Sequence, residues 1–316
     1  LTKTLRVFFD VNTQKRLFNC LYNTIIHSDM RQIFLFVIIT IFGATIHSQN
    51  VPNNNFSVKE DTIPKKILDY ANFRIYYDYN YAPEAEFPED KVDALTLLQV
   101  GEKYTRFMDY NWFRADSICD ANVRKGNDVM NYMAEMRNAL NLREFKSNIV
   151  TDRKLKQHTI QQNIVLSEKY QYQENIPTIQ WNLIQGDTII AGYNCKRATC
   201  KLYGRNYIAW YTPEIRLPYG PYQFYGLPGL ICKIIDTEDN FNFTLVGLEQ
   251  IKFIDPIYIW SGKNIIMSNR NEVRKIFRNY CANPAKAIMN SGKRIKIPSD
   301  VLSTIEPLPY NPVDKE

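Results

Sequence analysis

The stretch Phe224-Tyr225-Gly226-Leu227-Pro228-Gly229-Leu230-Ile231 decides the fold. Glycine admits backbone angles that other residues avoid, and Pro228 fixes its own φ angle and pushes the residue before it toward an extended conformation. An apolar, β-branched run follows, so we expect a tight corner that starts a strand near Leu230, with Leu227 and Leu230 in the core. The alternative is that this aromatic, glycine-rich corner faces a ligand or a partner.

Strands with short connections surround this corner. Residues 193–202 and 207–212 precede it, and residues 230–235 are predicted to pair with 241–248 across a turn rich in Asp and Asn. Connections this short join antiparallel neighbours. The sequence therefore predicts an antiparallel meander.

Further strands are predicted upstream from alternating apolar and polar residues. A hairpin is expected from 179–183 and 188–190, with its turn at Gly186-Asp187. The other predicted strands are 73–81, 95–100 and 103–108, of which the last two form a hairpin.

Two segments have helical patterns. Within residues 117–146, apolar side chains recur on one helical face, and the Met residues among them are typical of core packing. Asn269 with Glu272 resembles a capping box at the start of a helix over 269–281. We predict a β-rich α+β domain: a curved antiparallel meander sheet, with a half-barrel as its candidate form, and two helical segments packed on it.

The N-terminal region is typical of a leader. Residues 30–48 combine a short basic start, an apolar run and a small residue at Ser48, which is typical of a secretory signal peptide and too short to span a bilayer. We expect Met30 to be the start, residues 1–29 to be a mis-called upstream extension, and residues 49–316 to form a single mature domain. No Cys follows the apolar run, so no lipid anchor is expected. The predicted location is the periplasm, the outer membrane surface or the exterior, with no transmembrane span after cleavage.

Composition excludes few functions. The formal net charge is +6 in 316 residues, without the concentrated basic face of a nucleic-acid-binding protein. Export permits disulfides, and the five cysteines after residue 48 are an odd number, so at least one is left without an intramolecular partner. His158 is the one histidine of the expected mature chain, which leaves no zincin-type site.

Six motifs, in order, carry a family resemblance. They are Trp181; Gly192-Tyr193-Asn194-Cys195-Lys196-Arg197-Ala198; Tyr203-Gly204-Arg205; Ala209-Trp210-Tyr211-Thr212; Gly220-Pro221-Tyr222-Gln223-Phe224; and Gly226-Leu227-Pro228-Gly229-Leu230-Ile231. Their order and spacing resemble the GLPGLI family, exported proteins of Bacteroidetes named after the last motif. The resemblance extends to residues 98–101 and to Tyr310-Asn311-Pro312. It implies a signal peptide, a β-rich domain and no established biochemical activity.

Some residues depart from the family pattern. Residues 117–146, Arg216, Cys200 and Cys232 are departures. The predicted meander brings the strands of Cys200 and Cys232 near each other, and we therefore hypothesise a disulfide between them. Cys195 and Cys200 are an odd number of residues apart, so they face opposite sides of a regular strand, and a buried free thiol is our interpretation of Cys195.

No catalytic signature is found in the chain. Gly-x-Ser-x-Gly and phosphate-binding glycine loops are absent, and no cofactor or metal is expected. We expect a non-catalytic envelope binding module that holds a hydrophobic small molecule on the concave face of the sheet, or docks an outer-membrane protein through residues 219–229. The alternative is an envelope hydrolase that uses carboxylates such as Asp236 with Glu238 or Asp239. The candidate binding surface comprises the motif residues Trp181, Gly192, Tyr193, Cys195, Gly204, Arg205, Trp210, Tyr211, Gly220, Pro221, Tyr222, Phe224, Gly226, Leu227, Pro228, Gly229 and Leu230.

Overall fold

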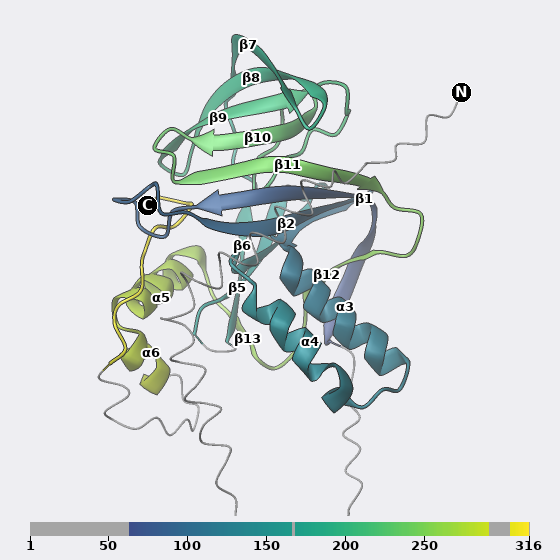
Figure 1. The fold of residues 1–316 in the computed structure, drawn as a ribbon, viewed down its shortest axis with the longest axis vertical. Helices are drawn as coiled ribbons and strands as arrows, with labels where there is room; N and C mark the ends of the chain where they lie inside the picture. The colour runs from purple at the N-terminus through teal and green to yellow at the C-terminus, as the bar shows by residue number, and fades with distance from the viewer. Residues whose placement is uncertain (1–62, 166–167, 291–303, 316) are drawn as a thin grey trace, which may run out of the picture. The chain divides into compact units, whose positions relative to one another are not determined.

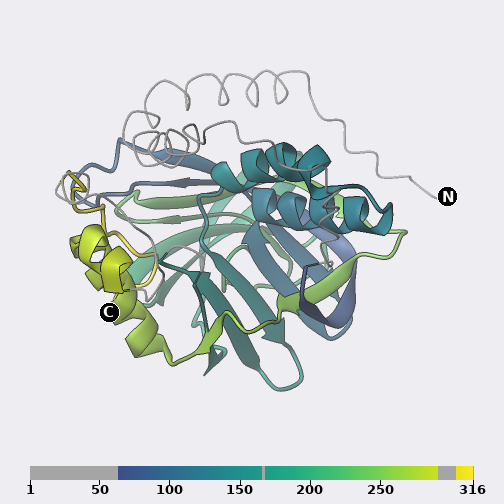
Figure 2. The ribbon, with the colours of Figure 1, turned by 90° about the horizontal axis from the view of Figure 1, so that it is seen from below.

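The computed structural model describes residues 63–165, 168–290 and 304–315, all of which belong to one compact unit, Lys59–Glu316. The predicted upstream extension, 1–29, and the predicted signal peptide, 30–48, lie outside the described residues. Thirteen strands form one curved sheet that does not close on itself, with helices packed against it (Figures 1 and 2). The predicted β-rich α+β class is confirmed.

The first strand is central to the sheet. β1 (Lys65–Tyr81) pairs antiparallel with β2 on one side and with β11 on the other, 160 residues or more away in sequence. One meander runs from β2 (Val92–Gly101) through β3 (Tyr104–Asp109), β4 (Ser147–Asp152) and β5 (Gln157–Asn163) to β6 (Lys169–Asn175). The other runs from β7 (Asn182–Ile190) through β8 (Tyr193–Leu202), β9 (Arg205–Thr212) and β10 (Leu230–Asp236) to β11 (Phe241–Gln250).

Two short strands complete the sheet. β12 (Pro256–Trp260) pairs with the first part of β1, and β13 (Ile265–Met267) lies parallel to β6 at one edge. β7 forms the opposite edge, so the predicted hairpin over 179–190 is wrong. The reason is a bulge between Ile184 and Asp187, which accommodates Gly186. β7 therefore continues in one direction and stays paired with β8 on both sides of the bulge.

The predicted helix over 117–146 is also corrected, because it is two helices. α3 (Tyr110–Arg124) starts earlier, capped by Asp109, and α4 (Val129–Asn141) starts after Asp128, which caps its backbone in the same way. The predicted helix start at Asn269 is confirmed, because the Asn269 side chain accepts from the Glu272 N–H at 3.0 Å at the start of α5 (Arg270–Ala282). α6 (Pro284–Asn290) follows.

The helices cover opposite faces of the sheet. α3 packs with Trp112 on Trp260 and Met108, on the face that β12 crosses. α5 contributes Val273 to the other face, where the main core lies. This core is rich in stacked aromatic rings, such as Tyr79 on Phe243 at a centroid distance of 4.5 Å. The strands that carry the motifs, β8 to β10, lie at the end of the sheet away from the helices (Figure 1).

Candidate functional site

The corner Gly226–Leu230 is buried rather than displayed. Phe224, Leu227 and Leu230 are 2%, 1% and 0% exposed, whereas Gly226 and Pro228 reach the surface. Gly229 has φ +148°, and a Cβ there would lie 2.0 Å from the Thr212 carbonyl oxygen. Only glycine fits this position without displacing backbone. The strand starts at Leu230, as the sequence predicts.

Tyrosine and tryptophan side chains hold the corner in place. Trp181 Nε1 donates to the Tyr225 carbonyl at 2.9 Å, and the Tyr225 hydroxyl donates to the Pro177 carbonyl at 2.7 Å. The Tyr203 hydroxyl donates to the Gln223 carboxamide oxygen, also at 2.7 Å. The segment before β7 is thereby fastened over the motif.

The remaining aromatic motif residues pack in the fold as well. Tyr211 is buried, and Trp210 is half-buried, with the Lys233 ammonium 5.6 Å from its ring centroid. Tyr193 lies against the edge of the core, while Gly192 and Gly204 form tight turns with positive φ. Tyr193, Trp210 and Tyr211 are not among the residues that line the polar cleft described below.

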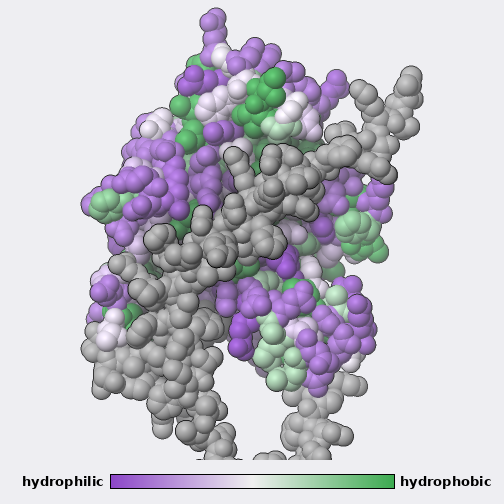
Figure 3. All heavy atoms as spheres, viewed as in Figure 1, coloured by the Kyte–Doolittle hydropathy of each residue, from purple (hydrophilic) through white to green (hydrophobic). Residues whose placement is uncertain are grey.

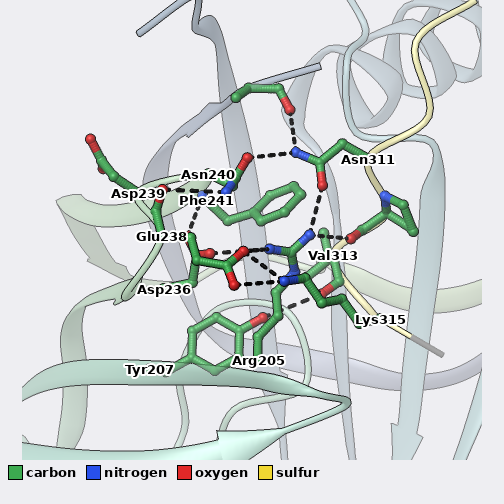
Figure 4. A network of polar contacts seen from close by, with 12 residues as sticks. Arg205, Tyr207, Asp236, Glu238, Asp239, Asn240, Phe241, Asn311, Val313 and Lys315 are labelled. Atoms are coloured by element: carbon green, nitrogen blue, oxygen red, sulfur yellow. Dashed lines mark hydrogen bonds and ion pairs between the residues drawn. The ribbon is translucent and has the colours of Figure 1, made fainter. Parts of the chain in front are cut away.

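Arg205, from the Tyr203-Gly204-Arg205 motif, is the centre of a buried polar network (Figure 4). It begins β9 and is 3% exposed. Its Nη1 donates to Asp236 at 3.2 Å and to Glu238 at 3.3 Å, both at the β10–β11 turn. The face of the guanidinium lies 4.6 Å from the Phe241 ring centroid. Two carboxylates and an aromatic ring therefore fix the orientation of this side chain.

The other donors of Arg205 bind the C-terminal segment, which we call the tail (residues 304–315). Nη2 donates to the Asn311 side-chain oxygen at 2.6 Å and to the Pro312 carbonyl at 3.0 Å, and Nε donates to the Val313 carbonyl at 3.0 Å. Asn311 in turn donates to the Ala82 carbonyl at 2.8 Å. Arg205 therefore binds the tail through two of its backbone carbonyls and through the Asn311 side chain.

Asp314 is the second anchor of the tail. Its carboxylate accepts from the Tyr222 hydroxyl at 2.6 Å and from Arg270 at 2.8 Å. Arg274 donates to its carbonyl oxygen, and Arg270 also binds Glu174 at 2.7 Å. Burial raises the pKa of Asp314, and the charge of Arg270 opposes this shift. The sequence analysis did not predict this anchor. Its one signal in the sequence is that Asp314 carries a negative charge, opposite to the charges of Arg270 and Arg274 on α5.

A polar cleft of about 560 Å³ lies beside the Arg205 network. Tyr207 lines the cleft, and its hydroxyl donates to the Val313 carbonyl at 3.3 Å. This residue therefore connects the cleft to the tail that Arg205 binds. The lining comes from the segment before β7, from the start of β7, from β8 and β9 and from the turn after β10. The lining residues are Thr178, Gln180, Asn182, Thr199, Cys200, Lys201, Asn206, Tyr207 and Thr237. Hydroxyl and carboxamide groups dominate this surface, and it includes no carboxylate.

The carboxylates singled out in the sequence are engaged in the turn after β10. Asp236 accepts from Arg205 and from the Phe241 N–H at 2.7 Å, and Asp239 pairs with Lys91 at 2.6 Å. Lys315 pairs with Glu238 at 2.6 Å and lowers the pKa of that carboxyl. A general acid needs a raised pKa, so this group is poorly suited to that role.

A second polar cluster lies under α3. The Asp116 carboxylate accepts from the Tyr258 hydroxyl at 2.6 Å and from Trp260 Nε1 at 2.7 Å. The Arg106 guanidinium lies 3.7 Å from the Tyr258 ring centroid, and burial lowers the pKa of Lys169 to about 8. Since these contacts tie α3 and β12 to the sheet, we interpret the cluster as an internal bridge.

The five cysteines of the described residues form no disulfide in the structure. Cys200 points toward the cleft from β8, and burial raises its pKa to about 12. Cys195 Sγ donates to the Tyr193 carbonyl at 3.5 Å and Cys232 Sγ to the Leu230 carbonyl at 3.6 Å, and the interaction with Cys232 lowers the pKa of the Cys195 thiol. The Cys200–Cys232 pairing stays a prediction.

Among the described residues, no group of His, Cys, Asp and Glu is arranged to hold a metal ion. No helix in the described ranges has the length and apolar character needed to cross a membrane.

Comparisons with known proteins give a family match over the motif strands. Residues 201–233 match the model of Porph_ging, described as a protein family of unknown function. No curated protein sequence matches the chain. Two crystal forms of PNGF-II are similar in structure, with TM-scores of 0.41 and 0.42 and sequence identities of 13% and 14%. These matches cover 65% and 64% of this chain and 32% of each PNGF-II chain, so the likeness spans about a third of that protein.

Proposed function

We propose that this chain is an exported envelope protein of the GLPGLI type that acts by binding rather than by catalysis. The ordered motifs support this proposal, and the Porph_ging match covers Arg205, Trp210 and the corner Gly226–Leu230. Export through cleavage after Ser48 is part of the proposal, with the Bacteroidetes cell envelope as its place. N-terminal sequencing of protein recovered from the envelope of a Bacteroidetes host tests it: a mature end at Gln49 is expected, and a chain that retains residues 30–48 contradicts it.

The polar cleft is the ligand site in this proposal. A cleft of about 560 Å³ falls within the usual range for small-molecule sites, and the Arg205 network holds one of its walls rigid. Its hydroxyl and carboxamide groups can both donate and accept hydrogen bonds, as the hydroxyl groups of a sugar do. We therefore infer a neutral saccharide as the ligand class. A hydrophobic ligand on the concave face has less support, because the aromatic side chains there pack against one another in a closed core.

Ligand titration of the purified protein tests the cleft. Gln180 and Asn206 line the cleft and are exposed, so the double variant Gln180→Ala with Asn206→Ala removes hydrogen-bonding groups without disturbing the core. Gln250 is exposed on β11 and is not among the lining residues, so Gln250→Ala is the matched control. We expect a neutral oligosaccharide from a screened panel to bind the wild type and the control, and to bind the double variant at least tenfold more weakly. Equal binding to all three proteins, or no binding by any panel member, overturns the assignment.

The alternative, a carboxylate-dependent hydrolase, has weaker support. Its named acids lie in ion pairs at a turn, and none lines the cleft. Hydrolysis of a bound saccharide that is lost in Asp236→Asn, in protein that remains folded, would favour it over pure binding.

A further inference from the structure

We propose that the tail regulates the polar cleft: its docked residues, 311–315, hold two walls of the cleft in place, and their release weakens ligand binding. Only the ligand rests on the proposed function, because every contact between the tail and the cleft walls lies within this chain. Tail docking and ligand binding are therefore expected to favour each other.

The first wall is the start of β9, where Asn206 and Tyr207 line the cleft. One tail carbonyl, that of Val313, binds this part of the chain twice. It accepts a hydrogen bond from the Tyr207 hydroxyl at 3.3 Å and another from Nε of Arg205 at 3.0 Å. Because Arg205 directly precedes Asn206, the tail is bonded to the residue before the wall and to the wall itself.

The second wall is the turn after β10, where Thr237 lines the cleft. Glu238 follows it in the chain, and its carboxylate accepts from the Lys315 ammonium at 2.7 and 2.6 Å. The Thr237 N–H donates to the Asn206 carbonyl at 2.9 Å, which joins the second wall to the first. In Figure 4 the Arg205 guanidinium lies between the carboxylates of this turn and the tail. The tail therefore contacts both sides of a connected structure.

Release of the tail would leave Arg205 with donors that have no acceptor. Asp236 and Glu238 accept from Nη1 only, whereas Nε and Nη2 donate to the tail. A buried donor without an acceptor is costly, and Arg205 is 3% exposed. The guanidinium therefore has to turn toward solvent when the tail leaves, and the start of β9 moves with it. The cleft has one shape with the tail docked and another with the tail released, which is what coupling between two sites requires.

Cys200 can report on the position of the first wall. It lines the cleft from β8, pairs with Tyr207 across the two strands and is 6% exposed. Burial raises the pKa of its thiol to about 12, so this thiol should be alkylated slowly while the tail is docked. Movement of Tyr207 would expose it. Cys195, on the same strand and 1% exposed, is not among the lining residues and is the internal control.

Variants of the full chain test whether the tail holds the walls. Asn311 and Asp314 anchor the tail through their side chains, and neither lines the cleft. The double variant Asn311→Ala with Asp314→Ala is therefore expected to release the tail without altering the cleft lining. Glu306 is exposed, belongs to the tail and precedes both anchors, so Glu306→Ala is the matched control.

The alkylation rates of the two thiols are read separately after trypsin digestion. Cys200 lies in peptide 198–201 and Cys195 in peptide 170–196. Folded protein is exposed to iodoacetamide for increasing times, and mass spectrometry measures the alkylated fraction of each peptide. Because the lost anchors comprise several hydrogen bonds, we expect Cys200 to react about tenfold faster or more in the double variant than in the wild type. Glu306→Ala should match the wild type, and the rate of Cys195 should stay the same in all three proteins.

A milder variant decides the matter where the double variant does not fold. Lys315→Ala removes a partly exposed ion pair with Glu238, so the alkylation of Cys200 should accelerate about twofold to fivefold. Unchanged Cys200 rates in the folded variants overturn the proposal. Equal acceleration of Cys200 and Cys195 also overturns it, because that pattern reflects a general loss of structure.

Saccharide titration separates this regulation from the proposed function. An oligosaccharide of the panel that binds the wild type is expected to bind the double variant about fivefold or more weakly, and to bind Glu306→Ala as it binds the wild type. Equal affinity for all three proteins, with Cys200 accelerated in the double variant, overturns the regulation of ligand binding. If no panel member binds the wild type, the ligand assignment fails, and the alkylation rates still decide whether the tail holds the cleft walls.

Discussion

Arg205 Nη2 donates a 2.6 Å hydrogen bond to the side chain of Asn311, although the two residues are 106 positions apart in the chain. Both belong to the motifs on which the sequence analysis based its family resemblance, one on the strand before the corner and one on the tail. Their contact gives a physical reason for motifs so far apart in sequence: the guanidinium holds the tail against the start of β9 and the β10–β11 turn. The motif residues are thus joined by structure before any ligand is considered.

Removal of the Arg205 side chain should destabilise the protein strongly. Arg205→Met leaves Asp236 buried at 2% exposure without its ion-pair partner and releases the tail. Loss of one partner of a buried ion pair costs about 3–5 kcal/mol in the free energy of unfolding. Urea denaturation measures this, with Lys233→Met, on the neighbouring strand and half-buried, as the control. A loss below about 1 kcal/mol would show that the network contributes little.

The tail should bind in trans. A chain shortened after residue 303 loses the hydrogen bonds that Arg205 makes to Asn311 and that Tyr222 and Arg270 make to Asp314. We expect a lower melting temperature that a synthetic peptide of residues 304–316 restores. A peptide with Asn311→Ala should restore less, because it loses contacts to Arg205 and to the Ala82 carbonyl. Because ion pairs hold Asp314, binding should weaken as salt concentration rises. Equal rescue by both peptides would contradict side-chain recognition of Asn311.

His158 should make stability depend on pH. Burial lowers its pKa from an ordinary 6.5 to about 4, and its Nδ1 lies 2.9 Å from the Thr151 hydroxyl. Between these pH values, His158 therefore binds a proton in the unfolded chain but stays neutral in the folded chain. Stability should fall as pH decreases from about 6.5 to about 4, by about 3 kcal/mol in total.

The comparison with His158→Gln isolates this effect. Burial raises the pKa of Asp109 to about 6, so this group has the opposite sign and reduces stability as pH rises through the same range. The free energy of unfolding is therefore measured for both proteins at each pH, and their difference is taken. A difference that does not change between pH 7 and pH 4 would rule out His158 as the titrating group.

Gly229→Ala and Gly226→Ala should differ in cost. At Gly229 an added Cβ would meet the Thr212 carbonyl oxygen at 2.0 Å, whereas at Gly226 its nearest neighbour is 3.8 Å away. Both have positive φ, which costs about 1–3 kcal/mol for a residue with a side chain. We expect Gly226→Ala to lose about that amount and Gly229→Ala to lose several kcal/mol, or to fail to fold. Similar melting temperatures of the two variants would contradict this, because they would mean that β9 and the corner move to accommodate the added Cβ at Gly229 without losing stability.

Much of the fold followed from local sequence patterns. The corner before Leu230, the antiparallel pairing of β10 with β11, the β2–β3 hairpin and the helix start at Asn269 are all confirmed. Each signal acts over a few residues, through backbone angles at glycine and proline or through the alternation of apolar side chains. Apolar periodicity did not reveal where the helix over 117–146 is interrupted, since two helices can have the same apolar face.

The tertiary structure alone decided the rest. β1 pairs with β11 across the whole domain, and the bulge at Gly186 turns a predicted hairpin into one edge strand. The sequence by itself determined the β-rich class and the motif corner. Which residues meet depends on strand order and register, and one extra residue in a strand changes the direction of a side chain. The tail anchor at Arg205 and the polar cleft beside it belong to this second group, because both are built from segments that only the completed sheet brings together.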